Sequence, residues 1–520
     1  MLGNLEGQIL SAHARRAVAF ANDLPTASRF DPRLPGFSMP GRNGVTASQS
    51  SMPLPESDDD IAFATLPELG AWIRTGELSS RRLTQIYLDR ISRFDPLLEC
   101  FATVTGELAL AEADAMDALT RAGVNLGPLH GLPYGLKDLF DTKGIVTGWG
   151  AEPYRDRVPD RDAAVVTRLR AAGAILIGKT SVGALAYGDI WYGGRTRNPW
   201  NLDEGSSGSS AGSASAAGAG LCAFAIGTET LGSITSPADR CGATGLRPTF
   251  GRVSRSGVMA LCWSLDKVGP ICRGAEDCAL VLAAINGGDA ADRFSIDAPF
   301  HFDAAGAIDG LRIGWLPKAF EDGADDVDRA ALEAVRSLNL PLVEAHLEDL
   351  PYASLLNILY AEAAASFEEL TLSDRDDLLA WQDDAAWPNS FRKARFMSAV
   401  DHVQLDRLRY RAMLAMQRMF EDIDVLIGPL GSGPMMITSN FTGHPCLHIR
   451  AGFADLPNRS GGALRNGKLM LGQTAGGQKR RVPKGISLWG RLFEEGRLVN
   501  LGMALEAKLG VAKQRPILQA

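Results

Sequence analysis

Two glycine-rich segments of the 520-residue chain carry residue types suited to chemistry at the ends of strands. The first runs from Gly205 to Ser215 as GSSGSSAGSAS, and the second runs from Gly227 to Ile234 as GTETLGSI. A buried strand is predicted between them, over 221–226. Glycine-punctuated turns at consecutive element ends leave backbone N–H groups free to hold an anion or a developing oxyanion. A flexible linker is the alternative, but a linker between independent domains would not separate two elements of one sheet.

Lys137 is the candidate base, because the usual partners of a serine nucleophile are missing from the sequence. The seven histidines form no HExxH or Cys/His cluster, and the glycines match neither a GxSxG turn nor a phosphate loop. Two SxxK matches, Ser264–Lys267 and Ser390–Lys393, lack companion motifs and are ascribed to chance. A lysine serves as a base when burial and neighbours lower its pKa to about 7–8. Lys137 ends an apolar strand, although a surface position is the alternative for any single lysine.

The elements that must position these residues alternate between short strands and helices. Strands are predicted at 174–177 (closed by Gly178), 221–226, 311–315, 342–346, 425–427 and 486–489. Helices are predicted near 5–22, from Thr65, from Ser79 or Ser80, and at 107–120, 162–172, 325–337, 355–372 and 400–420. The alternation predicts an α/β fold with a central mixed or mainly parallel sheet surrounded by helices.

The composition excludes several classes of protein. Hydrophobic residues make up 46% and charged residues 22%, as in soluble globular proteins. The net charge is −8 and no long basic run occurs, so we expect no binding to nucleic acid or to an anionic membrane. No apolar run is long enough to span a membrane. The seven scattered cysteines indicate reduced thiols in a cytoplasmic protein. No metal or other cofactor is expected.

From about Ile61 to about Leu501 the sequence resembles the amidase signature family. The strongest stretch is Gly205 to Arg273, and further matches occur near the C-terminus. The matching motifs include CGATGLRPT (241–249), GRVSR (251–255), WSLD (263–266), VGP (268–270) and TGHP (442–445). Their number and common order make the resemblance specific. Residues 1–60, rich in Pro, Gly and Ser, are predicted to form an N-terminal helix and an extended arm. The resemblance implies 61–520 as an amidase-signature domain with a core (126–315), a helical substrate-side region (316–424) and C-terminal return strands (425–520).

The resemblance also implies a catalytic triad. By position, Ser233 would be the nucleophile and Lys137 the base, while Ser209, 24 residues before Ser233, would be the bridging serine with a cis peptide bond. The oxyanion hole would consist of four consecutive backbone N–H groups, those of Thr230, Leu231, Gly232 and Ser233. The implied enzyme is an amidase that hydrolyses the C–N bond of a small aryl or apolar amide through an acyl-enzyme.

Several positions depart from the commonest family pattern. Leu231 replaces a glycine, Glu229 stands where aspartate is usual, Thr235-Ser236 stand where an arginine is common, and Ser487 stands where glutamine is frequent. These departures favour a stand-alone amidase over a protein that works in a complex, like the glutamine-amide-cleaving subunit of tRNA-dependent amidotransferases. A carbamate or ester hydrolase with the same triad and an inactive binding scaffold are the remaining alternatives.

Aromatic residues near the glycine loop are candidates for the substrate pocket. Trp191 and Tyr192 either wall an aromatic or apolar pocket or belong to the core. The helical stretch 350–420 supplies further candidates for which packing is the alternative: Trp381, Trp387, Phe391 and Phe396. A small-molecule amide is the expected binding partner, and a homodimer is the assembly considered.

Overall fold

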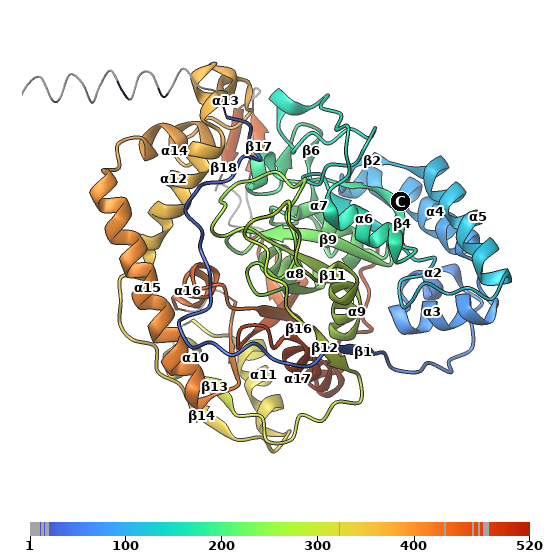
Figure 1. Cartoon of the computed structure of the whole chain (residues 1–520). Helices are drawn as coiled ribbons and strands as arrows, with labels where there is room; N and C mark the ends of the chain where they lie inside the picture. The colour runs from blue at the N-terminus through green and yellow to red at the C-terminus, as the bar shows by residue number, and fades with distance from the viewer. Residues whose placement is uncertain are drawn as a thin grey trace, which may run out of the picture.

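The computed structural model describes residues 11, 15, 20–321, 323–430, 433–459, 462–465, 468–471 and 478–519. These residues form a mixed sheet of 11 strands with helices packed around it (Figure 1). The α/β fold with a central mixed sheet is therefore confirmed. In order across the sheet the strands are β14 (Leu342–Glu344), β13 (Ile313–Trp315), β15 (Val425–Gly428), β19 (Arg480–Gly490), β16 (Cys446–Leu456), β10 (Thr244–Arg247), β11 (Lys267–Cys272), β9 (Phe224–Glu229), β3 (Pro133–Lys137), β4 (Ile175–Thr180) and β2 (Phe101–Val104).

Strand direction changes across the sheet. β3 is parallel to both of its neighbours, β4 and β9, and β13 is parallel to both β14 and β15. The other neighbouring strands pair antiparallel. The late strands β15 and β19 return to the same sheet, as the sequence predicts. The parallel pairing of β3 with β9 places the C-terminal end of β3, where Lys137 lies, beside the end of β9 that leads into the second glycine-rich segment.

Local signals in the sequence fix several helix ends. Helix α3 (Leu66–Thr75) begins with a capping box between Thr65 and Glu68, and Ser79 is the N-cap of α4 (Ser80–Leu98). The observed strands differ in extent from the predicted ones, and two of these differences lie near the candidate site. β4 continues past Gly178 to Thr180, and β9 begins only at Phe224, because 221–223 form a turn after α7 (Ala211–Gly218).

Two helix pairs pack on the middle of the sheet. Helix α7 packs against α8 (Thr235–Cys241), and α9 (Ala275–Ile285) packs against α17 (Glu495–Leu509). The remaining predicted helices are α5 (Gly106–Arg121), α6 (Ala164–Ala171), α11 (Asp326–Arg336), α12 (Leu356–Ser366), α13 (Glu368–Leu372) and α15 (Ala399–Asp422). Shorter helices are α2 (Asp58–Ala62), α10 (Pro317–Glu321), α14 (Trp387–Ala394) and α16 (Met435–Phe441). Among the described residues, no helix is long and apolar enough to cross a membrane.

The N-terminal arm is fastened to the body along its length. It runs from beside α13, past α16, to β1 (Gly44–Thr46), which pairs in parallel with β12 (His301–Asp303) (Figure 1). Asn22 exchanges two hydrogen bonds with the backbone of Ala260, and the guanidinium carbon of Arg409 lies 3.4 Å from the centre of the Phe30 ring. The helix predicted near 5–22 falls almost wholly outside the described residues. All seven cysteines are buried and have free thiols.

Candidate active site

Lys137 lies at the end of β3, fully shielded from solvent. Its Nζ is 2.9 Å from Ser209 Oγ, 3.0 Å from Ser210 Oγ and 2.7 Å from Thr228 Oγ1. Among the described residues, no carboxylate lies within ion-pair distance of this nitrogen. Burial holds the pKa of Lys137 well below its ordinary value, against the opposing charges of Asp266 and Glu229. The site therefore favours a neutral amine surrounded by hydroxyl groups.

A second buried lysine on the neighbouring strand provides a contrast. Lys179 of β4 forms an ion pair with Asp138 at 3.1 Å and donates hydrogen bonds to Phe140 O and Thr147 Oγ1. Burial lowers the pKa of Lys179, while the charge of Asp138 opposes this effect. The carboxylate partner suits a structural cation, whereas the hydrogen-bond partners of Lys137 among the described residues are hydroxyl and carbonyl oxygens.

Ser209 belongs to a tight turn between β8 (Asn201–Gly205) and α7. The peptide bond from Gly208 to Ser209 is cis, as the family resemblance predicts. Gly208 has to be glycine, because a Cβ there would lie only 1.8 Å from Gly188 O. The Ser210 N–H donates to Ser233 O at 3.1 Å, which holds this turn against the second glycine-rich segment.

The segment after β9 presents Ser233 just before α8. Ser233 is 8% exposed and lines a cavity, and Gly232 adopts a left-handed conformation (φ +83°). Within the described part of the chain, the backbone N–H groups of Thr230, Leu231, Gly232 and Ser233 donate to no other protein group. Four consecutive unpaired donors beside a serine suit the binding of an oxyanion.

A buried ion pair between Glu229 and Arg247 holds the start of α8, next to the Thr230–Ser233 segment. Glu229 Oε2 accepts the backbone N–H groups of Ile234 and Thr235, and Oε1 lies 2.7 Å from Arg247 Nη1. Burial alone would raise the pKa of Glu229, but Arg247 and the two amides outweigh it and lower the pKa to about 2. The glutamate therefore stays ionised and fixes the start of α8, immediately after Ser233.

The cavity lined by Ser233 has a volume of about 350 Å³ and mainly apolar walls. Its aromatic residues are Tyr187, Trp191, Trp381 and Trp387. Tyr192 is not among the described lining residues; its ring lies edge-on to Trp191 with ring centres 5.0 Å apart. Phe391 is buried and stacks on Trp387, whereas Phe396 is 91% exposed. The charged side chains at the cavity are Glu152, Asp189, Arg195 and Arg240.

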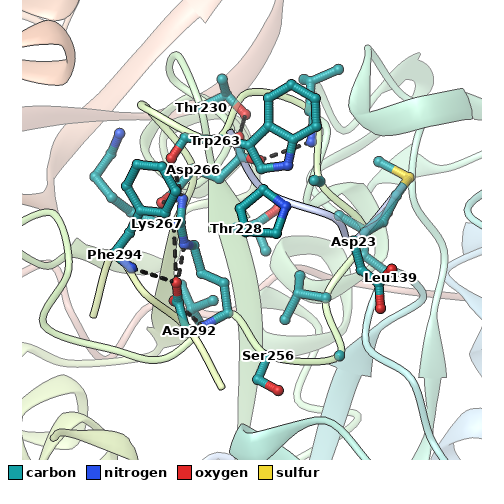
Figure 2. A pocket seen from close by; sticks show the side chains of 18 of the residues that line it. Asp23, Leu139, Thr228, Thr230, Ser256, Trp263, Asp266, Lys267, Asp292 and Phe294 are labelled. Carbon is teal, nitrogen blue, oxygen red and sulfur yellow. Dashed lines mark hydrogen bonds and ion pairs between the residues drawn. The ribbon is translucent and has the colours of Figure 1, made fainter. Parts of the chain in front are cut away.

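A second cavity of about 140 Å³ adjoins the same segment (Figure 2). Thr228 and Thr230 line this cavity, whereas Leu231 and Ser233 line the larger one. Figure 2 shows Lys267 and Phe294 on one side of it and Asp23 and Leu139 on the other. Thr230 Oγ1 donates to Asp266 Oδ1 at 2.7 Å, so the wall of this cavity also holds the N-terminal end of the Thr230–Ser233 segment.

The SxxK match at Ser264–Lys267 does not form a serine–lysine pair. Ser264 Oγ donates to Glu362 Oε1 and accepts from Arg409 Nη1, whereas Lys267 Nζ donates to Leu265 O. This geometry agrees with the interpretation that the Ser264–Lys267 match arose by chance.

Several residues of the site lie outside the sequence-based prediction. Ser210 and Thr228 contact Lys137, Arg247 pairs with Glu229, and Arg240 lies at the cavity. The available signal for Arg240 was its place seven residues after Ser233, which is two helical turns. No spacing connects Thr228 with Lys137, because strand pairing brings them together.

Comparisons with known proteins agree with this geometry. The family model described as amidase matches residues 82–499. The A subunit of glutamyl-tRNA(Gln) amidotransferase from Halorhodospira halophila is 36% identical over 492 residues, covering 87% of this chain and 98% of the relative. Its counterpart from Geobacter metallireducens is 34% identical over 478 residues, covering 85% and 96%.

Solved structures lead to the same family. The structure of native peptide amidase from Stenotrophomonas maltophilia superposes with a TM-score of 0.72 at 28% sequence identity, covering 88% of this chain and 99% of that one. The family match over residues 82–499 includes all the segments that build the site. This chain is therefore an enzyme of the amidase class and belongs to the amidase family.

Proposed function

We propose that this enzyme is a stand-alone amidase that hydrolyses the C–N bond of a small amide through Ser233, Ser209 and Lys137. The observation that carries the proposal is the 2.9 Å approach of a buried Lys137 Nζ, with a lowered pKa, to Ser209 Oγ. Two N–H groups of a neutral lysine can donate to Thr228 Oγ1 and Ser210 Oγ. The lone pair is then left for the hydroxyl proton of Ser209.

The reaction proceeds in two halves. Lys137 takes a proton from Ser209 as Ser209 takes one from Ser233, and Ser233 Oγ attacks the amide carbonyl. The oxyanion is held by the backbone N–H groups of Thr230 to Ser233; at comparable sites the loss of one such donor costs about 10²–10³ in rate. The C–N bond then breaks as Ser209 returns a proton to the leaving amine. Water attacks the acyl-enzyme with the same base and releases the acid.

The larger cavity is the proposed acyl site. Trp191 forms part of its wall and Tyr192 supports Trp191 through the edge-on contact. Leu231, which takes the place of a usual glycine, adds an apolar side chain beside Ser233. These walls favour an aryl or apolar group next to the scissile bond. The seven buried thiols support a cytoplasmic location.

Purified protein and a panel of aryl amides, alkyl amides, carbamates and esters test the proposal. Ser233→Ala, Ser209→Ala and Lys137→Ala should each lose at least about 10²-fold in kcat/KM, because each removes a participant in proton transfer or attack. The matched controls are Ser373→Ala and Lys143→Ala, whose side chains are exposed. Near-wild-type amide turnover in any triad variant would refute the assignment. Faster cleavage of esters or carbamates than of amides by wild type would identify the enzyme as an ester or carbamate hydrolase instead.

A second candidate function follows from the curated relatives, which are subunits of an amidotransferase. As such a subunit, the chain would release ammonia from glutamine for a partner protein. The substitutions at Thr235, Leu231 and Ser487 favour the stand-alone enzyme. Glutamine hydrolysis that appears only with added amidotransferase partner subunits would favour the second function, whereas amide hydrolysis by a monodisperse single chain or homodimer would favour the first.

A further inference from the structure

Arg240 places a cation at the wall of the larger cavity. It lies in the last turn of α8, seven residues after Ser233, and both residues line this cavity. Side chains of an α-helix lean toward its N-terminal end, which in α8 is the end next to Ser233. A helix rises about 1.5 Å per residue, so the six steps from Ile234 to Arg240 span about 9 Å. The arginine side chain is therefore expected to lean back along the helix toward the end next to Ser233.

The guanidinium of Arg240 has a donor to spare. Within the part of the chain that the structure describes, the side chain of Arg240 donates no hydrogen bond: Nη1 is shielded from solvent and has no acceptor, while the side chain as a whole is 16% exposed. Its ion pair with Glu204 Oε2 spans 3.7 Å, which is too long for a hydrogen bond. Glu204 is already held by Asn198 and by both the side chain and the backbone of Arg459. Glu204 therefore balances Arg240 electrostatically without saturating it.

The other charged groups at the cavity do not supply an acceptor. Asp189 pairs with Arg195 at 3.3 Å and accepts the Ser207 N–H. Burial raises the pKa of Glu152, which favours its neutral form. The part of the Arg240 guanidinium that is exposed at the cavity has no acceptor among the described residues, so an anionic ligand group there would form a charge-assisted hydrogen bond with it.

We propose that Arg240 binds a carboxylate on the acyl part of the substrate, so that the preferred substrates are monoamides of short dicarboxylic acids. The inference rests on the proposed function, because it places the acyl group in the cavity beside Ser233. The distance along α8 suits about two or three methylene groups between the scissile carbonyl and the carboxylate. The remaining apolar walls would contact the methylene chain and the amine part.

Four anilides test the inference on the whole chain. The 4-nitroanilides of succinic and glutaric acid carry the acyl carboxylate, and those of butanoic and pentanoic acid are their neutral partners. Wild type should prefer the anionic member of each pair by roughly 10- to 100-fold in kcat/KM. Arg240→Gln should reduce this ratio to about 1, and Arg240→Lys should retain part of it. Arg480→Gln, which removes an exposed arginine paired with Asp203, should keep the wild-type ratio.

Two results with these anilides would overturn the inference: no preference for the anionic acyl group, or an unchanged ratio in Arg240→Gln. A fifth anilide, 4-(pentanoylamino)benzoate, carries its carboxylate on the amine part. A preference for this compound alone would also overturn the inference. Neutral anilides that are hydrolysed without any charge preference would leave the proposed function intact. A protein that hydrolyses no anilide would contradict the proposed function instead. Calorimetric titration tests whether Arg240 binds a carboxylate. Glutarate should bind to wild type more tightly than pentanoate does, and the two should bind to Arg240→Gln with similar affinity. Equal affinities of glutarate and pentanoate for wild type would refute the binding of a carboxylate by Arg240.

Discussion

Glu229 and Arg247 form an ion pair with an Nη1–Oε1 distance of 2.7 Å, and both side chains are at most 1% exposed. The second oxygen of the same carboxylate accepts the Ile234 and Thr235 N–H groups. This pair therefore joins a strand end, the start of α8 and, through Arg247, the Ser439 hydroxyl and the His444 carbonyl. The position of Ser233 depends on a network buried beneath it.

Glu229→Gln should lower the free energy of unfolding by about 3–5 kcal/mol, because it leaves the Arg247 charge buried without a counter-charge. Urea denaturation of the variant and wild type measures the difference. Asp203→Asn, which breaks the exposed pair with Arg480, is the control and should change stability little. Equal stability of Glu229→Gln and wild type would show that the network does not support the segment.

Acid should destabilise the wild type through the same carboxylate. The pKa of Glu229 is lowered from 4.5 to about 2, so its contribution to stability is complete above about pH 4.5 and is lost as the pH falls toward 2. Asp239, whose pKa is also about 2 because His448 and Arg459 outweigh its burial, acts in the same direction. The free energy of unfolding of Glu229→Gln should consequently fall less steeply between pH 4.5 and 2 than that of wild type. Parallel curves would contradict the ionised state of Glu229.

Amide hydrolysis should increase with pH through the titration of Lys137. The proton transfer needs the neutral amine, and burial places its pKa well below the ordinary 10.5, so activity is lost as the pH falls through that lowered pKa. Measuring kcat/KM for a neutral anilide between about pH 5 and 10 gives the profile. Lys137→Arg, which cannot lose its proton in this range, should lose about 10²–10⁴-fold. A rate that falls with rising pH would contradict a lysine base.

Thr228 should orient Lys137. Its hydroxyl lies 2.7 Å from Nζ, and Thr228→Val removes this acceptor while nearly keeping the side-chain shape. We expect kcat to fall about 10-fold and the midpoint of the pH–rate profile to shift. Thr228→Ser keeps the hydroxyl and should restore most of the activity. A Thr228→Val enzyme with an unchanged rate and pH profile would exclude this positioning role.

The sequence predicts local features of the fold well, because local chemistry determines them. The capping box at Thr65 and the strand that ends in Lys137 depend on a few neighbouring residues. The apolar run 221–226 was less informative, because a buried turn and a buried strand have the same composition. The division of 61–520 into three regions stays a prediction.

The cavity was much harder to predict, because several segments that are distant in the sequence build it. Residues near 190, near 235 and near 385 converge there, and no sequence spacing relates them. Trp191 and Trp387 line the cavity while Phe391 packs in the core, although all three have the same aromatic character. Arg240 was missed for the same reason: its role depends on the space that other segments leave open.

Reaction with a serine-directed phosphonate, followed by peptide mass spectrometry, tests the central claim most directly. Ser233 should carry the adduct in wild type, since the proposed mechanism activates its hydroxyl and Ser233 lines an accessible cavity. Ser233→Ala should remain unlabelled, and Lys137→Ala should react at least about 10²-fold more slowly at Ser233. An adduct on another serine, or an equal rate of labelling in Lys137→Ala, would contradict a Ser233 nucleophile activated by Lys137.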